Sequence, residues 1–195
     1  MNVHVTSHGL GLRSRAVLRR VQQITPDAAR IVTRQVGPLP HTTVTVTTTW
    51  GLIELAQRAD YAMVPEVPAA DRRRWRGEYE TNGKQAAGHT LLEPRGVLVL
   101  IAPSAGLAEA DVVTLHELVH AAQMNRPGTR ALLTAYNRHF FGIEPMDAAE
   151  LQAVERLIED HESEAHGLEQ QLLDALHARH APAQTPFTAL LGGTR

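Results

Sequence analysis

The hydrophobic pattern of the chain mixes strands and helices in its first half and becomes mostly helical in its second half. Alternating or continuous apolar positions predict strands at residues 3–5, 42–49 and 96–102. Apolar positions at helical spacing predict helices at residues 13–23, 26–36, 52–62, 107–124, 129–141 and 147–177. The pattern therefore predicts an α+β fold whose C-terminal half is mainly helical.

Local signals refine three of these elements. Thr25 and Pro26 are typical of a helix start, so we expect a break between the first two helices. Residues 42–49 alternate valine with threonine, which predicts a strand with one face in water. Residues 96–102 are continuously apolar, which predicts a strand buried on both faces.

The length of 195 residues, 43% of them hydrophobic, is suited to a single domain. Within residues 1–195 we expect an N-terminal part of helices and strand at 1–64 and a long loop or flap at 65–95. The loop is expected because that segment is rich in proline, glycine and charge. The main helical part follows at 96–177, and a loosely docked tail at 182–195.

Charge and hydropathy exclude several classes of partner. Nineteen Lys and Arg against 21 Asp and Glu leave a net charge of -2, so there is no overall attraction to nucleic acid or to an anionic membrane. The first residues lack the basic and apolar regions of a signal peptide, and no apolar stretch reaches the roughly 18 residues needed to span a bilayer. We therefore expect a cytoplasmic protein; the sequence does not predict its oligomeric state.

The absence of cysteine restricts the chemistry further. It removes disulfides, thiolate metal ligands and cysteine nucleophiles, so any metal must be held by His, Asp or Glu. There are 11 histidines to draw on. Those in segments of irregular or strand pattern are expected at the surface: His4, His8, His41 and His89.

One motif carries specific chemistry: His116, Glu117 and His120 form the sequence HELVH, an instance of HExxH. Four residues along a helix are a rotation of about 400°, so the two imidazoles leave the same face and can share one metal ion. Glu117 lies about 100° away, near enough to reach a water on that metal. The surrounding residues are uncharged, and burying these three groups without a partner would be costly. The motif therefore predicts a metal site.

An apolar strand followed by a helix bearing HELVH resembles the zincin metallopeptidases. The metzincin branch needs a glycine three residues and a histidine six residues beyond the second histidine, but Gln123 and Arg126 stand there. The resemblance, which covers residues 96–173, therefore points to the gluzincin branch, in which a glutamate on a later helix completes the site. It implies a zincin-like fold, with a small mixed sheet packed on the active-site helix, and one zinc ion per chain.

The last helix offers several candidates for the third ligand. The segment from Glu162 to His166 is similar to the E-x-E-A-D or E-x-E-A-N stretch of gluzincins, in which the first glutamate binds zinc and the residue four later supports a ligand histidine. Glu162 is thus the first choice, with His166 in the supporting position. Glu159 is the alternative ligand, and other candidates share its helix face or lie next to it: Glu155, His161 and His166.

The resemblance implies a zinc-dependent endopeptidase in which Glu117 acts as general base toward water. A further donor to the developing oxyanion is expected downstream of the motif, from Tyr136, His139 or His161. The substrate would be a peptide or protein, paired along an exposed edge of the strand at 43–49 or at 96–102. Two alternatives stay open: a zincin-scaffold module that binds a peptide or protein without hydrolysis, and a zinc hydrolase of a nonpeptide amide.

Overall fold

The computed structural model describes residues 3–83, 86–103 and 106–180. At its centre is a four-stranded sheet in the order β1-β2-β4-β3, so that β1 and β3 are the edge strands. β1, β2 and β4 are parallel, and β3 is antiparallel to β4. The strands are β1 (Val3–His8), β2 (Thr42–Thr47), β3 (Gly88–Glu93) and β4 (Gly96–Ile101). The expected α+β class with a small mixed sheet is confirmed.

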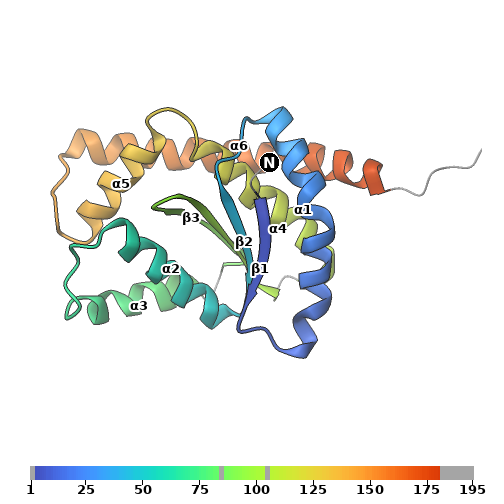
Figure 1. Ribbon diagram of the computed structural model, residues 1–195. Helices are drawn as coiled ribbons and strands as arrows, with labels where there is room; N and C mark the ends of the chain where they lie inside the picture. The colour runs from blue at the N-terminus through green and yellow to red at the C-terminus, as the bar shows by residue number, and fades with distance from the viewer. Residues whose placement is uncertain (1–2, 84–85, 104–105, 181–195) are drawn as a thin grey trace, which may run out of the picture.

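Helices cover both faces of this sheet. The α-helices are α1 (Arg15–Gln35), α2 (Thr49–Met63), α3 (Arg72–Gly83), α4 (Gly106–Gln123), α5 (Thr129–Phe140) and α6 (Ala148–His180), with one short 3-10 turn at Leu12–Ser14. Figure 1 shows α1 and α4 on one side of the sheet and α2 and α3 on the other, with the long α6 running past α4. Among the described residues, no helix combines the length and apolar character that crossing a membrane requires.

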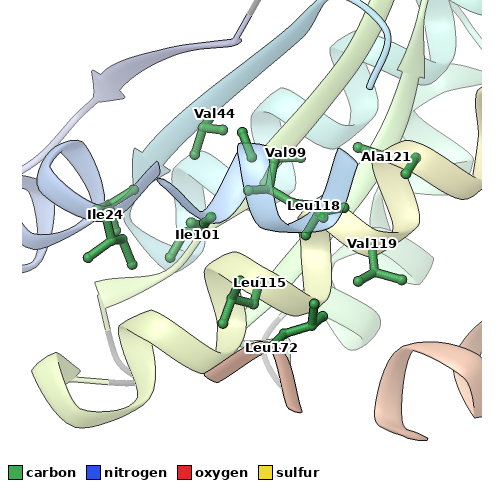
Figure 2. Packing of buried hydrophobic residues seen from close by; sticks show 14 of the residues in the cluster. Ile24, Val44, Val99, Ile101, Leu115, Leu118, Val119, Ala121 and Leu172 are labelled. Carbon is green, nitrogen blue, oxygen red and sulfur yellow. The ribbon is translucent and has the colours of Figure 1, made fainter. Parts of the chain in front are cut away.

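Side chains of β4 point alternately to the two faces of the sheet, and both faces are covered, which explains its continuously apolar sequence. Val97, Val99 and Ile101 belong to the large core cluster under α1 and α4, whereas Leu98 and Leu100 belong to the cluster under α2. Both faces of the strand are therefore buried, as predicted. Figure 2 shows Val99 and Ile101 packed with residues of α1, α4 and α6 in the large cluster.

The structure corrects the prediction of a wet face for β2. The strand lies between β1 and β4, and five of its six residues are buried. Its threonine hydroxyls find partners inside the sheet: Thr45 bonds the hydroxyl of Thr6 at 2.8 Å, and Thr47 donates to the carbonyl of His8 at 2.9 Å. A run of alternating threonines can thus form an interior strand when neighbouring strands accept its hydrogen bonds.

The expected break before Pro26 is also wrong, because α1 continues through it. The buried positions Val21, Ile24 and Ala28 keep helical spacing across the proline, so a single stripe faces the core. Pro26 itself is exposed, and the hydroxyl of Thr25 donates to the carbonyl of Val21 at 2.6 Å. Core packing therefore outweighs the local signal for a helix start.

Residues 65–95 are not simply a loop or flap, since they contain α3 and the edge strand β3. α3 is polar and packs beside α2, where Trp75 and Tyr79 join the apolar clusters. The expected tail at 182–195 lies outside the described residues.

Two packed helices position the chemistry. α4 follows β4 and presents Leu115, Leu118 and Val119 to the core, while α6 contributes Ala165 and Leu172 to the same cluster. α6 begins with reciprocal bonds of 2.8 Å between Asp147 and Glu150, an arrangement known as a capping box. The polar faces of α4 and α6 are thereby fixed next to each other.

Candidate metal centre

The two motif histidines converge at the surface of α4. Their Nε2 atoms lie 2.9 Å apart, with the ring planes at 79°. Both rings are half-buried, whereas Leu115, Leu118 and Val119 on the opposite side of the helix are fully buried. The apolar residues of the motif region thus anchor the helix so that both imidazoles leave it in the same direction.

Glu162 of α6 completes a cluster with these histidines. One of its carboxylate oxygens lies 3.6 Å from His116 Nε2 and the other lies 3.4 Å from His120 Nε2. Among the described residues, the alternative ligands Glu159 and Glu155 belong to no group of three potential ligands. Of the glutamates considered from sequence, the fold therefore brings Glu162 to the histidine pair.

Each histidine has a partner for its other ring nitrogen. His116 Nδ1 lies 2.9 Å from a carboxylate oxygen of Glu169, and His120 Nδ1 lies 2.8 Å from the amide oxygen of Gln123. Gln123 is fully buried, and its amide nitrogen donates to the carbonyl of His161 and to the carboxylate of Glu164. Because these oxygens can only accept, each Nδ1 acts as the donor, and in the neutral ring this leaves the Nε2 lone pair to bind a metal.

This arrangement fits a divalent metal ion. Two nitrogen lone pairs and a carboxylate face the same point, and a cation there turns their mutual repulsion into attraction. Tetrahedral zinc with bonds of about 2.0–2.2 Å would hold its ligand atoms about 3.3–3.5 Å apart. The two imidazole nitrogens are 2.9 Å apart, and each has a Glu162 oxygen at 3.4 or 3.6 Å, so the groups lie close to that spacing. Burial also lowers the pKa of His120, which favours the neutral ring that binds metals.

His166, which the family pattern places in a supporting role for a ligand histidine, has different contacts in the structure. His166 does not bond His116; its ring lies beside that of His116, with centroids 4.8 Å apart, and its Nδ1 shares the Glu169 oxygen at 2.7 Å. Glu169, two helical turns beyond Glu162, orients His116 instead. Such carboxylate–histidine pairs fix the ring and raise its basicity toward a metal.

Glu117 lies on the other side of the histidine pair, against β3. The Thr90 hydroxyl approaches one of its carboxylate oxygens at 2.7 Å and its backbone carbonyl at 3.0 Å. Gly88 leaves room for this carboxylate, because a Cβ there would lie 2.5 Å from the other oxygen. Burial raises the pKa of Glu117 to about 8, opposed by the Thr90 hydrogen bond. Glu117 is thus held beside the cluster without being part of it.

The cluster opens into a cavity of about 500 Å³. Its walls come from α2, β3, α4, α5 and α6, and two of the expected donors, Tyr136 and His161, line it. His139 does not: its Nδ1 accepts from the backbone nitrogen of Met146 at 3.0 Å and holds the connection between α5 and α6. The structure therefore brings two of the three candidate donors into the cleft.

Sequence reasoning missed several residues of this cleft. His89, expected at the surface, lines the cavity from β3, and burial lowers its pKa. The seven-residue spacing from Glu162 places Glu169 on the same helix face, a signal that could have identified it. No comparable signal exists for His89 or Thr90, because their approach to α4 depends on strand pairing.

Comparisons of the chain with protein-family models, with curated proteins and with solved structures found no match. The likeness to zincins therefore rests on the residues and geometry described above.

Proposed function

We propose that this chain is a zinc-dependent metallopeptidase of the gluzincin type, with a zincin-like fold and one zinc ion held by His116, His120 and Glu162. The observation that carries the proposal is the convergence of these three side chains from two helices, next to Glu117 and open to a cavity. A structural metal site has no need of a free carboxylate beside its ligands or of an open side.

Glu117 serves as general base in this proposal. Zinc, when bound, supplies Lewis acidity that polarises a carbonyl group and lowers the pKa of water to about 7. In its ionised form Glu117 accepts the proton of the attacking water and delivers it to the leaving amine, a contribution typically worth about 10²- to 10⁴-fold in rate. Its bond to Thr90 holds one carboxylate oxygen in place. Tyr136 and His161 are the donors available to the oxyanion.

A peptide substrate is supported by the position of β3. The strands first considered for substrate pairing, at 43–49 and 96–102, are interior and have no free edge. β3 is an edge strand, and its residues Gly88 to Leu92 line the cavity beside the histidine pair. An extended peptide can therefore pair with β3 by main-chain hydrogen bonds while one of its carbonyl groups faces the cluster.

The proposal is tested by measuring zinc content and peptide hydrolysis in matched variants. His116→Ala, His120→Ala and Glu162→Ala should each abolish stoichiometric zinc binding. Glu159→Ala, an exposed carboxylate one turn earlier on α6, should retain it. A purified chain that binds no zinc after reconstitution, or a Glu162→Ala variant that binds it normally, contradicts the ligand set.

The Glu117→Gln variant separates an enzyme from a binding module. It should keep zinc and lose hydrolysis of unfolded casein by at least 100-fold, because the amide cannot accept the proton. If zinc-loaded wild type leaves casein and mixed peptides uncut, the peptidase assignment fails.

A further inference from the structure

A side pocket branches from the metal cleft between α2, α3 and α5. It has a volume of about 190 Å³, enough for one long side chain. Four residues line both the pocket and the cleft: Asp60, His89, Tyr136 and Asn137. A side chain next to the bond at the metal centre could thus enter this pocket.

The pocket is apolar along its walls and acidic in its polar groups. Leu52, Ile53 and Ala56 of α2 and Phe140 of α5 form the apolar walls. Its charged residues are Asp60 and Glu78, and no lysine or arginine is among the described lining residues. The two carboxylates are therefore not offset by a lysine or arginine of the pocket wall, and they make the pocket attractive to a cation.

Asp60 is a half-buried carboxylate whose charge has no cationic partner in the described part of the chain. One of its oxygens accepts from the Tyr79 hydroxyl at 2.6 Å and the other from the Asn137 amide at 3.2 Å. These neutral donors leave acceptor capacity on both oxygens. Burial raises the pKa of Asp60 to about 6, so the carboxylate is still ionised at pH 8. Burying a charge in this way without a cation is costly.

We propose that this pocket binds an arginine or lysine side chain of the substrate peptide, and that Asp60 is the residue that selects it. The methylene stem packs along Leu52, Ile53 and Phe140, and the cationic head pairs with the Asp60 carboxylate. This inference deepens the proposed peptidase function and rests on it for its biological meaning.

A purely structural role for Asp60 makes a different prediction. In that case the carboxylate only ties α2 to α3 and α5 through Tyr79 and Asn137, and a basic ligand gains nothing from it. The Asp60→Asn variant keeps an acceptor for Tyr79 but removes the charge. Tyr79→Phe removes a hydrogen bond but keeps the charge. The two variants therefore separate the effect of the Asp60 charge from the effect of its hydrogen bond to Tyr79.

The experiment measures binding of N-acetyl-arginine amide and N-acetyl-citrulline amide to the full chain at pH 8, with and without zinc, by NMR titration. Citrulline has nearly the shape of arginine but no charge. Wild type and Tyr79→Phe should bind the arginine probe at least tenfold more tightly than the citrulline probe. Asp60→Asn should bind the two probes equally.

Equal binding of both probes by wild type overturns the proposal without needing any variant. Retained discrimination in Asp60→Asn, or its loss in Tyr79→Phe as well, also overturns it. These readouts do not depend on catalysis, so a failure of the peptidase assignment is seen separately as absence of cleavage. If that assignment holds, cleavage sites in a peptide library should share a basic residue at one fixed position, and Asp60→Asn should lose that preference.

Discussion

The Glu117 carboxylate is held in place by β3, which packs closely against α4 at this point. Thr90 donates to it, and the missing side chain of Gly88 makes room for it. Both residues lie on the same face of β3, because side chains two apart along a strand point the same way. Position 88 is therefore as much a part of the site as the charged residues.

Substitution Gly88→Ala should disturb Glu117 while sparing the metal ligands. The new Cβ would lie 2.5 Å from a Glu117 oxygen and 2.7 Å from its Cγ, so the carboxylate must shift. We expect unchanged zinc content, a loss of at least tenfold in peptide hydrolysis, and a loss of about 1–3 kcal/mol in the free energy of unfolding from overpacking.

Gly167→Ala is the matched control, because nothing lies within 4 Å of a Cβ at this helical position. It should keep activity and raise the free energy of unfolding by about 0.5–1 kcal/mol. Urea unfolding and zinc analysis of both variants check these outcomes. A Gly88→Ala variant as active and as stable as wild type would show that β3 does not hold Glu117.

Among the residues of the site, the sequence predicted those that lie close together along the chain. His116, Glu117 and His120 lie within one and a half turns of a helix, so their relative positions follow from helical geometry alone. Glu162 was placed ahead of Glu159 by a family pattern, whereas its approach to the histidine pair depends on how α6 packs on α4. His89, Thr90 and Asp60 were not predicted, because their approach to the site is set by contacts between distant segments.

Among the elements, α1 shows tertiary packing overriding a local signal. Its buried stripe continues across Pro26, although proline lacks the N–H that would bond the carbonyl of Gln22. Gln22 and Pro26 both face solvent, so water can satisfy that carbonyl. The helix therefore tolerates a residue that usually interrupts one.

Pro26→Ala should stabilise the protein. Alanine restores one helical hydrogen bond and removes the steric conflict of the ring, which is worth about 3 kcal/mol, while the more flexible unfolded chain offsets up to about 1 kcal/mol. We expect a net gain of about 2 kcal/mol in the free energy of unfolding, measured by urea titration. Unchanged or reduced stability would mean that the proline ring makes a favourable contact in the folded state.

The elements that sequence reasoning missed are those with weak periodicity. α3 is polar, with arginine at four of its first five positions, and packs mainly through aromatic residues. β3 begins with Gly88 and has only two large apolar residues, Leu91 and Leu92. By contrast, β4 is apolar at every position after Gly96, α4 and α6 have long apolar stripes, and the structure confirms all three elements.

In the whole molecule, Asp60 of α2 joins three helices, because its half-buried carboxylate bonds Tyr79 of α3 and Asn137 of α5. Burial raises its pKa from 3.8 to about 6. The folded state therefore binds a proton more tightly than the unfolded state does, and stability falls as pH rises through this window. A shift of about two pKa units corresponds to a loss on the order of 3 kcal/mol above pH 6.

Asp60→Asn should remove this pH dependence. Relative to wild type, the variant should gain on the order of 3 kcal/mol in the free energy of unfolding between pH 4 and pH 7. Urea unfolding at pH 4, 5, 6 and 7 measures the difference, in which the other titrating groups largely cancel. A constant difference across that range would show that Asp60 keeps an ordinary pKa. If Asp60 is retained for function at a cost in stability, Asp60→Asn should be more stable than wild type and should no longer bind arginine.

The continuity of α6 has a consequence for how the metal centre can vary. Glu162 and Glu169 are two turns apart on one unbroken helix, one facing both imidazoles and the other holding the ring of His116 from behind. Inserting a single residue between them would swing the second carboxylate about 100° around the helix axis. The proposed ion site thus depends on helical register as well as on ligand identity, and we expect a length change to disable it with every proposed ligand intact.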